Sequence, residues 1–347
     1  MMYRFNNDYS LNAHPAVLKA VSDISGHAYG GYGLDEICTE AADLIKARIG
    51  APDADVHFLV GGTQTNYTVI SAALLPYQSV LCAESGHINV HETGAVEHIG
   101  HKITALPHTD GKITAGQIAK AGEDFRISDV QEHITEPGMV YISFPTEYGT
   151  VYTLQELEEI RTACDEYGLV LFIDGARLGY GLAAEGNDVT IQDIARIADV
   201  FYIGGTKCGA LFGEAVVIRN KRIGHRFRSH IKQNGGMLAK GFLLGAQFRA
   251  LFADDLYFKI TEQAVGKAMR IKEAFREKGI PSYIESPTNQ QFVLLTDRQC
   301  AVFSENFVFE NEGTAEDGMH ISRFCTSWGT TEEETEALIS AIRDLNI

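Results

Sequence analysis

The sequence predicts an α/β protein in which a doubly wound, largely parallel sheet is followed by a smaller α+β region. Short apolar runs alternate with segments of helical apolar spacing through most of the chain, as expected for buried strands covered by helices. From about Leu238 this alternation is replaced by one long helical stretch. The 347 residues are enough for a large domain and a smaller one, each with its own core.

The expected strands of the large sheet are seven apolar runs of the kind that is buried on both faces. They lie at Val56–Val60, Val80–Ala83, Lys102–Leu106, Met139–Phe144, Leu169–Ile173, Val200–Ile203 and Ala215–Ile218. The helices expected among them lie at Asp35–Ile49, Thr65–Leu75, Leu154–Tyr167 and Ile191–Ala198. This alternation favours a mostly parallel order of strands.

The C-terminal part has a different pattern. A helical region is expected from Leu243 to Lys278. Strand-like runs follow at Gln291–Leu295, Val302–Phe309 and His320–Phe324. A final helix should begin at Thr331, because its hydroxyl lies three residues before Glu334 in a capping box.

These patterns predict three parts of the chain. Residues 1–25 form an N-terminal segment that packs with the small domain, residues 26–240 form the large domain, and residues 241–347 form the small C-terminal domain. No flexible linker or internal repeat separates them. We therefore expect the domains to pack closely and the site to lie in a cleft between them.

Composition and charge exclude several classes of protein. The 29 basic and 46 acidic residues give a net charge of −17, which repels nucleic acid and anionic lipid. The first fourteen residues lack the apolar core of a signal peptide, and no later run approaches the ~18 apolar residues of a membrane span. The six cysteines have no paired short spacing, so they are expected to be reduced thiols. We expect a cytoplasmic protein without nucleic-acid or membrane partners.

Asp174 is a candidate functional carboxylate because it stands at the carboxyl end of a predicted buried strand, where open α/β sheets present their ligands. A buried carboxylate needs a partner. Beside a pyridinium nitrogen, an aspartate supports the electron sink of pyridoxal phosphate (PLP) chemistry. The alternative is that Asp174 caps the following helix.

Lys207 follows the next strand, in the small-residue segment Gly204–Gly209. Burial there would lower the pKa of its amine and leave it nucleophilic, as a lysine that forms a Schiff base requires. Alone, such a lysine is more often a solvated surface charge, or a phosphate contact. Together with Asp174, it predicts a PLP enzyme in which Lys207 carries the cofactor and Asp174 holds its ring nitrogen protonated.

Three further motifs have competing interpretations. Gly61–Asn66 opens a helix after the first strand and would suit a phosphate at the helix start. The alternative is that Thr63 is a plain N-cap. The segment is not a Walker loop, because it has no G-K-[ST]. Gly179–Ala184 fits G-x-G-x-x-A but begins too far from the strand end for a dinucleotide site. His87 and His91 could face one metal beside Glu92, but no third ligand is identifiable, so no metal is predicted. We expect His87 to stack on a pyridine ring instead.

Taken together, these residues resemble the PLP-dependent threonine aldolases and the wider β-eliminating lyase family, of the aspartate-aminotransferase fold type I. The resemblance covers essentially the whole chain. Its most specific parts are G-T-Q-x-N at Gly62–Asn66, H-x-x-x-x-E at His87–Glu92, D-G-A-R at Asp174–Arg177, and Thr206-Lys207. It implies PLP as the cofactor.

The resemblance also implies a role for each matching residue. Gly62, Thr63 and Gln64 would bind the phosphate. His87 would stack on the cofactor ring, and Asp174 would hold the pyridine nitrogen. Arg177 would bind the phosphate or the substrate carboxylate, and Arg323 the carboxylate. Asn7 stands where many members have a serine that helps this arginine bind the carboxylate. Tyr32 matches an aromatic residue that lines the entrance to the site.

Two positions depart from the family pattern. Glu147 stands where well-studied aldolases have a histidine at the substrate's β-hydroxyl, so it is either a catalytic base or a carboxylate paired with a cation. In the Gly-rich segment 234–238, which in the family reaches a neighbouring subunit's phosphate, Leu238 replaces the usual arginine. Lys240 is the candidate replacement. A homodimer or homotetramer with composite sites is therefore expected.

The resemblance implies a carbon–carbon lyase that cleaves a β-hydroxy-α-amino acid of the L-threonine or L-allo-threonine type into glycine and an aldehyde. Alternatives on the same scaffold are β-elimination, transamination and racemisation, because one fold hosts many chemistries. A catalytically silent regulatory subunit is the alternative from another class. Stereoselectivity and the choice between dimer and tetramer stay open.

Overall fold

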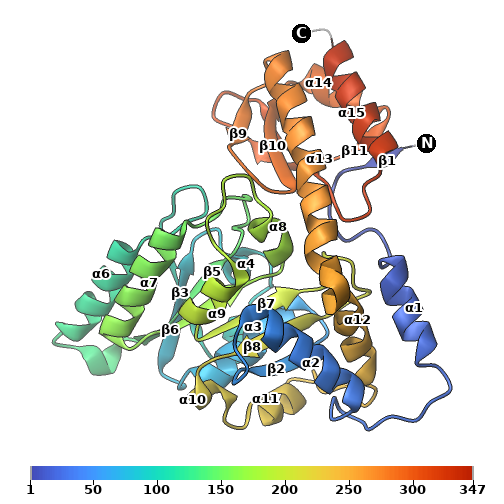
Figure 1. The fold of residues 1–347 in the computed structure, drawn as a ribbon. Coiled ribbons are helices and arrows are strands. Elements are labelled where there is room, and N and C mark those ends of the chain that lie inside the picture. The colour runs from blue at the N-terminus through green and yellow to red at the C-terminus, as the bar shows by residue number, and fades with distance from the viewer. Residues whose placement is uncertain (1, 346–347) are drawn as a thin grey trace.

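The computed structural model describes residues 2–345 and contains a large and a small sheet joined by a long helix (Figure 1). Met1, Asn346 and Ile347, at the outer ends of the predicted terminal parts, lie outside the described residues. The small sheet lies at the top of the view and the large sheet below it. Among the described residues, no helix is both long and apolar enough to span a membrane.

The large sheet has seven strands in the order β2-β8-β7-β6-β5-β3-β4. They are β2 (Asp55–Leu59), β3 (Gln78–Ala83), β4 (Lys102–Leu106), β5 (Glu136–Ser143), β6 (Val170–Asp174), β7 (Val200–Gly204) and β8 (Glu214–Ile218). Only β8 runs against its neighbours, so the predicted mostly parallel α/β sheet is confirmed. The expectation that every strand is buried on both faces is wrong for β2 and β4, because each is an edge strand and stays partly exposed.

Helices cover both faces of this sheet. The first face holds α2 (Glu36–Ile49), α7 (Leu154–Tyr167) and α9 (Ile191–Ile197), whose apolar residues share a cluster with Leu171 and Ile173 of β6. The second holds α3 (Gly62–Ala73), α5 (Ala95–His98) and α11 (Phe227–Gln233), which cluster with Val170 and Phe172 of the same strand. The alternation along β6 is the period-2 pattern of a strand buried on both faces.

The remaining helices of residues 2–240 either were not predicted from the sequence or are short. They are α1 (Pro15–Asp23), α4 (His87–Val90), α6 (Ala115–Arg126), α8 (Leu178–Leu182) and α10 (Lys221–Gly224), with a 3-10 turn, η1 (Gln131–His133). The start of α6 is marked by a capping box between Thr114 and Gln117, a signal that the sequence carried. The predicted helix at Thr65 begins earlier, at Gly62.

The predicted helical region Leu243–Lys278 is two helices, α12 (Phe242–Phe252) and α13 (Leu256–Lys278). They are separated by a 3-10 turn, η2 (Ala253–Asp255), in which Asp254 and Asp255 have φ of 53° and 55°. Two consecutive left-handed residues cannot continue an α-helix, so the chain changes direction there. From this turn α13 rises to the small sheet (Figure 1).

The small sheet is antiparallel, in the order β12-β13-β10-β9. Its strands are β9 (Ser282–Ile284), β10 (Gln290–Leu295), β12 (Glu310–Thr314) and β13 (His320–Cys325). The last helix, α15 (Glu332–Asp344), begins after Thr331 with the predicted capping box. The smaller α+β part is therefore present as predicted.

The predicted strand at Val302–Phe309 is wrong. Residues 302–304 end α14 (Asp297–Ser304), which starts with a capping box between Thr296 and Gln299. Only Phe307–Val308 form a strand, β11, and it pairs in parallel with β1 (Tyr3–Arg4). The N-terminus thus lies beside the C-terminal part of the chain, as Figure 1 shows.

Candidate active site

Two adjoining cavities lie at the carboxyl ends of β5, β6 and β7, where the sequence placed its candidate residues. The inner cavity, of about 320 Å³, is lined by Gly62, Thr63, His87, Glu147, Asp174, Arg177, Lys207 and Glu214, among others. The wider cavity, of about 730 Å³, shares His87, Glu147, Arg177 and Lys207 with it and extends to Arg323 of β13. Open α/β sheets bind ligands at this edge.

Asp174 ends β6 and is buried, and four donors surround its carboxylate. Oδ1 accepts from Tyr202 Oη at 2.5 Å and from the Ala176 N–H at 2.9 Å, and Oδ2 accepts from Tyr141 Oη at 2.5 Å and Asn66 Nδ2 at 3.2 Å. Hydrogen bonds of this kind stabilise the ionised form of a carboxylate. The alternative helix-cap role does not match the structure, because the N-cap of α8 is Arg177.

Lys207 lies in the turn after β7, is partly buried and lines both cavities. Burial lowers the pKa of its amine, and the positive charge of Arg177 lowers it further. Its backbone is held by Tyr180, whose hydroxyl donates to the Lys207 carbonyl at 2.7 Å. A buried amine with a lowered pKa is a better nucleophile than a solvated lysine.

The start of α3 forms one wall of the inner cavity. Gly61 is its N-cap and makes no side-chain cap, so Thr63 lies in the first turn and is not the N-cap. A Cβ at Gly62 would stand 3.3 Å from Tyr202 Oη, a tight contact. The first N–H groups of a helix have no partner within it and suit a phosphate. The Gln64 side chain turns away and donates to the Asn234 carbonyl at 3.1 Å.

A hydrogen-bonded chain holds His87. Its Nδ1 lies 2.7 Å from Oε1 of the buried Glu92, which also accepts from Asn66 Nδ2 at 2.6 Å. Asn66 also donates to Asp174, so Asn66 links Asp174 to the Glu92 side chain that holds His87. The His91 ring is 5.5 Å from that of His87, but the described residues contain no group of three or more side chains able to hold a metal.

Glu147 lies in both cavities, and its Oε1 accepts from the His87 N–H at 2.9 Å and from Ser143 Oγ at 2.7 Å. Burial raises the pKa of this carboxyl above its ordinary value. Both partners are neutral donors, so the alternative of a carboxylate paired with a cation does not match these contacts. The base role of Glu147 stays a prediction.

Two arginines point toward the cavities from different parts of the chain. Arg177 is held by a bidentate pair with the buried Asp8, with Nε to Oδ2 at 2.7 Å and Nη2 to Oδ1 at 3.1 Å. Burial alone would raise the pKa of Asp8, but the charges of Arg177 and Lys207 hold it below its ordinary value. Arg323 contacts Glu312 at 2.8 Å and donates to the Asn6 carbonyl at 3.1 Å.

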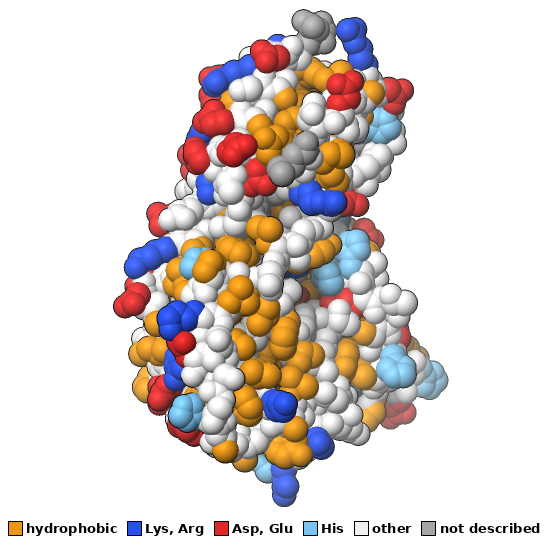
Figure 2. Space-filling view, turned by 90° about the vertical axis from the view of Figure 1, so that its right-hand side faces the viewer, with side chains coloured by type: hydrophobic (Ala, Val, Ile, Leu, Met, Phe, Trp, Pro, Cys, Tyr) orange, Lys and Arg blue, Asp and Glu red, His pale blue; other side chains and the backbone are white. Residues whose placement is uncertain are grey.

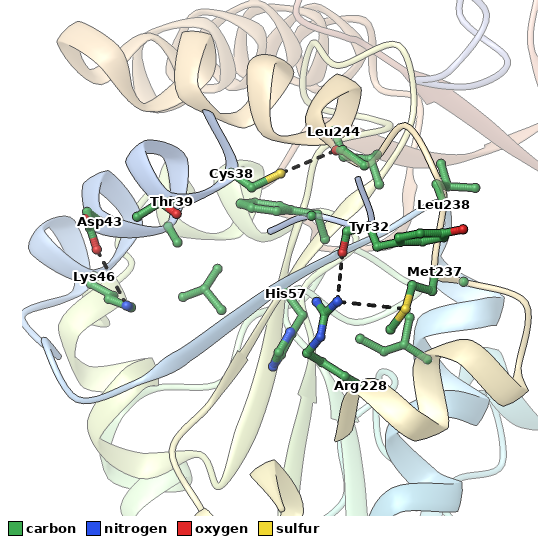
Figure 3. Close-up of a pocket in the computed structure, with 17 residues that line it drawn as sticks. Tyr32, Cys38, Thr39, Asp43, Lys46, His57, Arg228, Met237, Leu238 and Leu244 are labelled. Carbon is green, nitrogen blue, oxygen red and sulfur yellow. Dashed lines mark hydrogen bonds and ion pairs between the residues drawn. The ribbon is translucent and has the colours of Figure 1, made fainter. Parts of the chain in front are cut away.

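Four predicted residues are not among those that line either cavity: Asn7, Tyr32, Gln64 and Lys240. The Asn7 oxygen accepts from the Tyr9 N–H at 3.1 Å within a local turn, and Tyr9 lines the cavities in its place. Tyr32 borders a separate pocket of about 170 Å³ near Arg228, which donates to its carbonyl (Figure 3). The Tyr32 N–H donates to Ala239 at 3.1 Å, so Tyr32 and the exposed Lys240 share one surface.

The glycines of the G-x-G-x-x-A pattern serve packing. A Cβ at Gly179 would stand 2.7 Å from Thr261, and one at Gly181 would stand 2.8 Å from Pro145. Both glycines lie in α8, which packs on α13. Close packing against α13 accounts for Gly179, and close packing against the Phe144–Pro145 segment accounts for Gly181, without a ligand.

Several residues that build the site were missed from the sequence: Asp8, Asn66, Tyr141, Tyr202 and Glu214. The two tyrosines carried a usable signal, because a tyrosine in a fully buried strand needs a partner for its hydroxyl. Glu214 carried a similar signal, as an acid at the start of an apolar run. Nothing local marked the pairing of Asp8 with a residue far along the chain.

Comparisons with known proteins agree with this geometry. The family model described as beta-eliminating lyase matches residues 16–298. A low specificity L-threonine aldolase from Pseudomonas aeruginosa is 28% identical, over 98% of this chain and 97% of that protein. The structure is similar to that of a Leishmania major threonine aldolase, with a TM-score of 0.95 and 42% identity over 98% of both chains. A Thermus thermophilus aspartate aminotransferase (TM-score 0.71, 14% identity, 99% of this chain and 92% of that one) shares the fold.

Proposed function

This chain belongs to the beta-eliminating lyase family, and we propose that it is a PLP-dependent aldolase that cleaves a β-hydroxy-α-amino acid of the L-threonine type to glycine and an aldehyde. The observation that carries the proposal is that Lys207 and Asp174 line one cavity together with the start of α3. The relatives named above as threonine aldolases support the choice of reaction.

The residues of the inner cavity fit PLP. Lys207 would bind the cofactor, Asp174 would hold the ring N–H, and His87 would cover one ring face. The N–H groups of Gly62 and Thr63 would hold the phosphate, where a larger side chain at Gly62 would meet Tyr202. When bound, PLP supplies an electron sink for the pair released at Cα.

The substrate carboxylate is assigned to Arg323 and Arg177. Both guanidinium groups border the wider cavity, and planar guanidinium groups bind carboxylates in bidentate fashion. Asp8 holds Arg177 in place, which fixes the direction in which the guanidinium can donate. With the carboxylate held between two domains, the β-carbon of the substrate is oriented relative to Glu147.

The proton of the β-hydroxyl is assigned to Glu147. As the Cα–Cβ bond breaks, the O–H bond of the substrate breaks, its electron pair becomes the second bond of the aldehyde carbonyl, and Glu147 takes the proton. The two hydrogen bonds found for Glu147 both fall on Oε1, which leaves Oε2 to accept it. Its pKa is raised by burial, which makes the carboxylate a stronger base than a solvated one. His87 or a water molecule is the alternative acceptor.

One product analysis tests the reaction. The purified protein with PLP is incubated separately with L-threonine, L-allo-threonine, phenylserine, serine and cysteine, with the Lys207→Ala variant as the control. We expect glycine and the matching aldehyde from the β-hydroxy substrates. Pyruvate or another keto acid as the main product would instead favour β-elimination or transamination and overturn the aldolase proposal.

We also propose at least a symmetric dimer with composite sites. Tyr32 and Lys240 lie together but away from Lys207 of their own chain, so a role for them in catalysis requires a second copy. Figure 2 shows hydrophobic side chains gathered over the large-domain part of one face. Light scattering that finds an active monomer would contradict the proposal.

Two broader expectations are kept as proposals. The division into residues 1–25, 26–240 and 241–347 is supported by the pairing of β1 with β11, which ties the N-terminus to the C-terminal part. Expression of residues 26–240 alone as a folded protein would test it. A cytoplasmic location is supported by the six cysteines, all of which are free thiols within the described residues.

A further inference from the structure

Glu214 is a buried carboxylate in the inner cavity that the reaction proposed above does not use. It is the first residue of β8, its side chain is only 3% exposed, and it lines the cavity together with Lys207. Because β8 runs antiparallel to β7, Glu214 is paired with Gly204, three residues before Lys207. A buried acid in such a place needs a structural or chemical reason.

The side chain of Glu214 holds the turn that carries Lys207. Its Oε2 accepts from the Gly205 N–H at 3.0 Å, and its Oε1 accepts from Thr206 Oγ1 at 2.9 Å. The same hydroxyl accepts from the Gly213 N–H at 3.0 Å. A Cβ at Gly205 would stand 2.6 Å from the Gly213 carbonyl, so the turn lies tightly against the start of β8. The two residues before Lys207 are thus clamped by one carboxylate.

The electrostatic surroundings connect Glu214 to Lys207 as well. Burial raises the pKa of Glu214 to about 8, against the opposing effects of the Thr206 hydrogen bond and the Lys207 charge, so Glu214 is mostly ionised only above that pH. The other ionisable groups near it are Asp174 of β6, Tyr202 of β7, Cys208 and Tyr257 of α13. Burial raises the pKa of Tyr202, Cys208 and Tyr257, so these three stay neutral near pH 7.

We propose that Glu214 is a positioning residue for Lys207: its carboxyl group clamps the Gly205–Thr206 turn, and when it is ionised its negative charge stabilises the protonated form of the lysine. The amine is thereby held toward the cavity in a protonation state that depends on Glu214. This role rests on the proposed function, in which Lys207 binds the cofactor. It adds a residue outside the motifs that carry the family resemblance.

The charge is tested on the protein without cofactor. The rate of reductive methylation of Lys207 is measured against pH by peptide mass spectrometry in the wild type and in Glu214→Gln, which keeps the shape and loses the charge. We expect the midpoint for Lys207 to move down by about one pH unit in the variant, because a nearby negative charge favours the ammonium form. The matched control is Glu136→Gln at the start of β5, a strand-starting acid that accepts from Gln78 Nε2 at 3.0 Å and does not line the cavity.

The clamp is tested by cofactor affinity, measured by fluorescence titration with PLP. Glutamine can still accept from the Gly205 N–H, so Glu214→Gln should stay within a few fold of the wild type. Glu214→Ala loses both hydrogen bonds and should bind PLP at least about tenfold more weakly. The absorbance of the cofactor-loaded variants against pH should show the same downward shift for Glu214→Gln as the methylation assay.

The outcomes separate this inference from the proposed function. An unshifted Lys207 midpoint in Glu214→Gln overturns the charge role, and equal affinity in Glu214→Ala overturns the clamp. If the wild type fails to bind PLP at all, the proposed function fails, while the methylation midpoints still decide whether Glu214 controls Lys207.

Discussion

Glu147 gives the sharpest test of the proposed chemistry, because substitution by glutamine removes the base with little structural change. Glutamine keeps an oxygen that can accept from the His87 N–H and Ser143 Oγ, so we expect a loss of no more than about 1 kcal/mol in the free energy of unfolding. Loss of general base catalysis typically costs about 10²–10⁴-fold in rate. The prediction is therefore a large fall in kcat with a nearly unchanged KM, because neither arginine is touched.

The pH profile adds a second readout for the same residue. A base with a raised pKa is protonated at low pH, so kcat should rise as pH increases through that pKa. Ser143 donates to Glu147 and thereby lowers the pKa, so Ser143→Ala should shift the acidic limb of the profile to higher pH. Glu147→His, which restores the histidine of well-studied aldolases, should recover part of the lost kcat.

The assay is release of acetaldehyde from L-allo-threonine, followed with an aldehyde-reducing coupling enzyme. Thermal or urea unfolding of each variant is measured in parallel, with Glu136→Gln as the matched control away from the cavities. An unchanged kcat in Glu147→Gln would refute the base role and transfer the proton to His87 or water. A fall in kcat that is matched by a large loss of stability would refute the claim that the effect is chemical.

Three further predictions follow from the same contacts. Lys207→Ala should lose the absorbance near ~420 nm that a lysine-bound cofactor gives, and borohydride reduction with peptide mapping should find the adduct on Lys207 and on no other lysine. Asp174→Asn should keep much of its PLP by equilibrium dialysis yet turn over more slowly by orders of magnitude, since the developing charge loses its partner. Asp8→Asn leaves Arg177 buried without its carboxylate and should lower the free energy of unfolding, measured with urea at neutral pH, by about 3–5 kcal/mol. Because the pKa of Asp8 is lowered in the folded state, the difference between wild type and variant should shrink as pH falls below about 4.

The sequence predicted the large sheet well because its strands are almost wholly apolar. Lys102–Leu106 was located to the residue, and the other strands were found within a few residues of their ends. The carboxyl ends of neighbouring parallel strands meet at one edge, so the places of Asp174 and Lys207 could be inferred together. The helix starts that the sequence predicted best were those with side-chain caps, such as Thr331.

The errors come from places where tertiary contacts decide. Val302–Phe309 has five apolar residues and looks like a strand, but Phe303 and Phe307 are buried in one cluster with Phe5 and Phe324 from other parts of the chain. The capping box at Thr296 favoured a helix before them. Apolar residues in a short run do not distinguish a strand from a helix, because either one can bury them.

Partners distant in the sequence could not be predicted either. Arg177 lines both cavities, but its contact with Asp8, which joins residues 169 positions apart, was not predicted. The position of Tyr32 is of the same kind, since its surface includes Ala239, far along the chain. Both are contacts between residues that are far apart in the sequence, which local patterns do not encode.

The ionisable groups of the cavities divide into two sets with different expected effects on the kinetics. Arg177 neutralises Asp8, and these two charges are fixed by a bidentate pair. In contrast, burial shifts the pKa of Glu147, Lys207 and Glu214 toward the neutral form of each. A fixed pair can orient a carboxylate at every pH, whereas groups that titrate nearer neutrality control proton transfer. The pH dependence should therefore appear mainly in kcat, and substitution of Asp8 should act mainly on KM for the amino acid. A strong pH dependence of KM in the wild type between pH 6 and 9 would contradict this division.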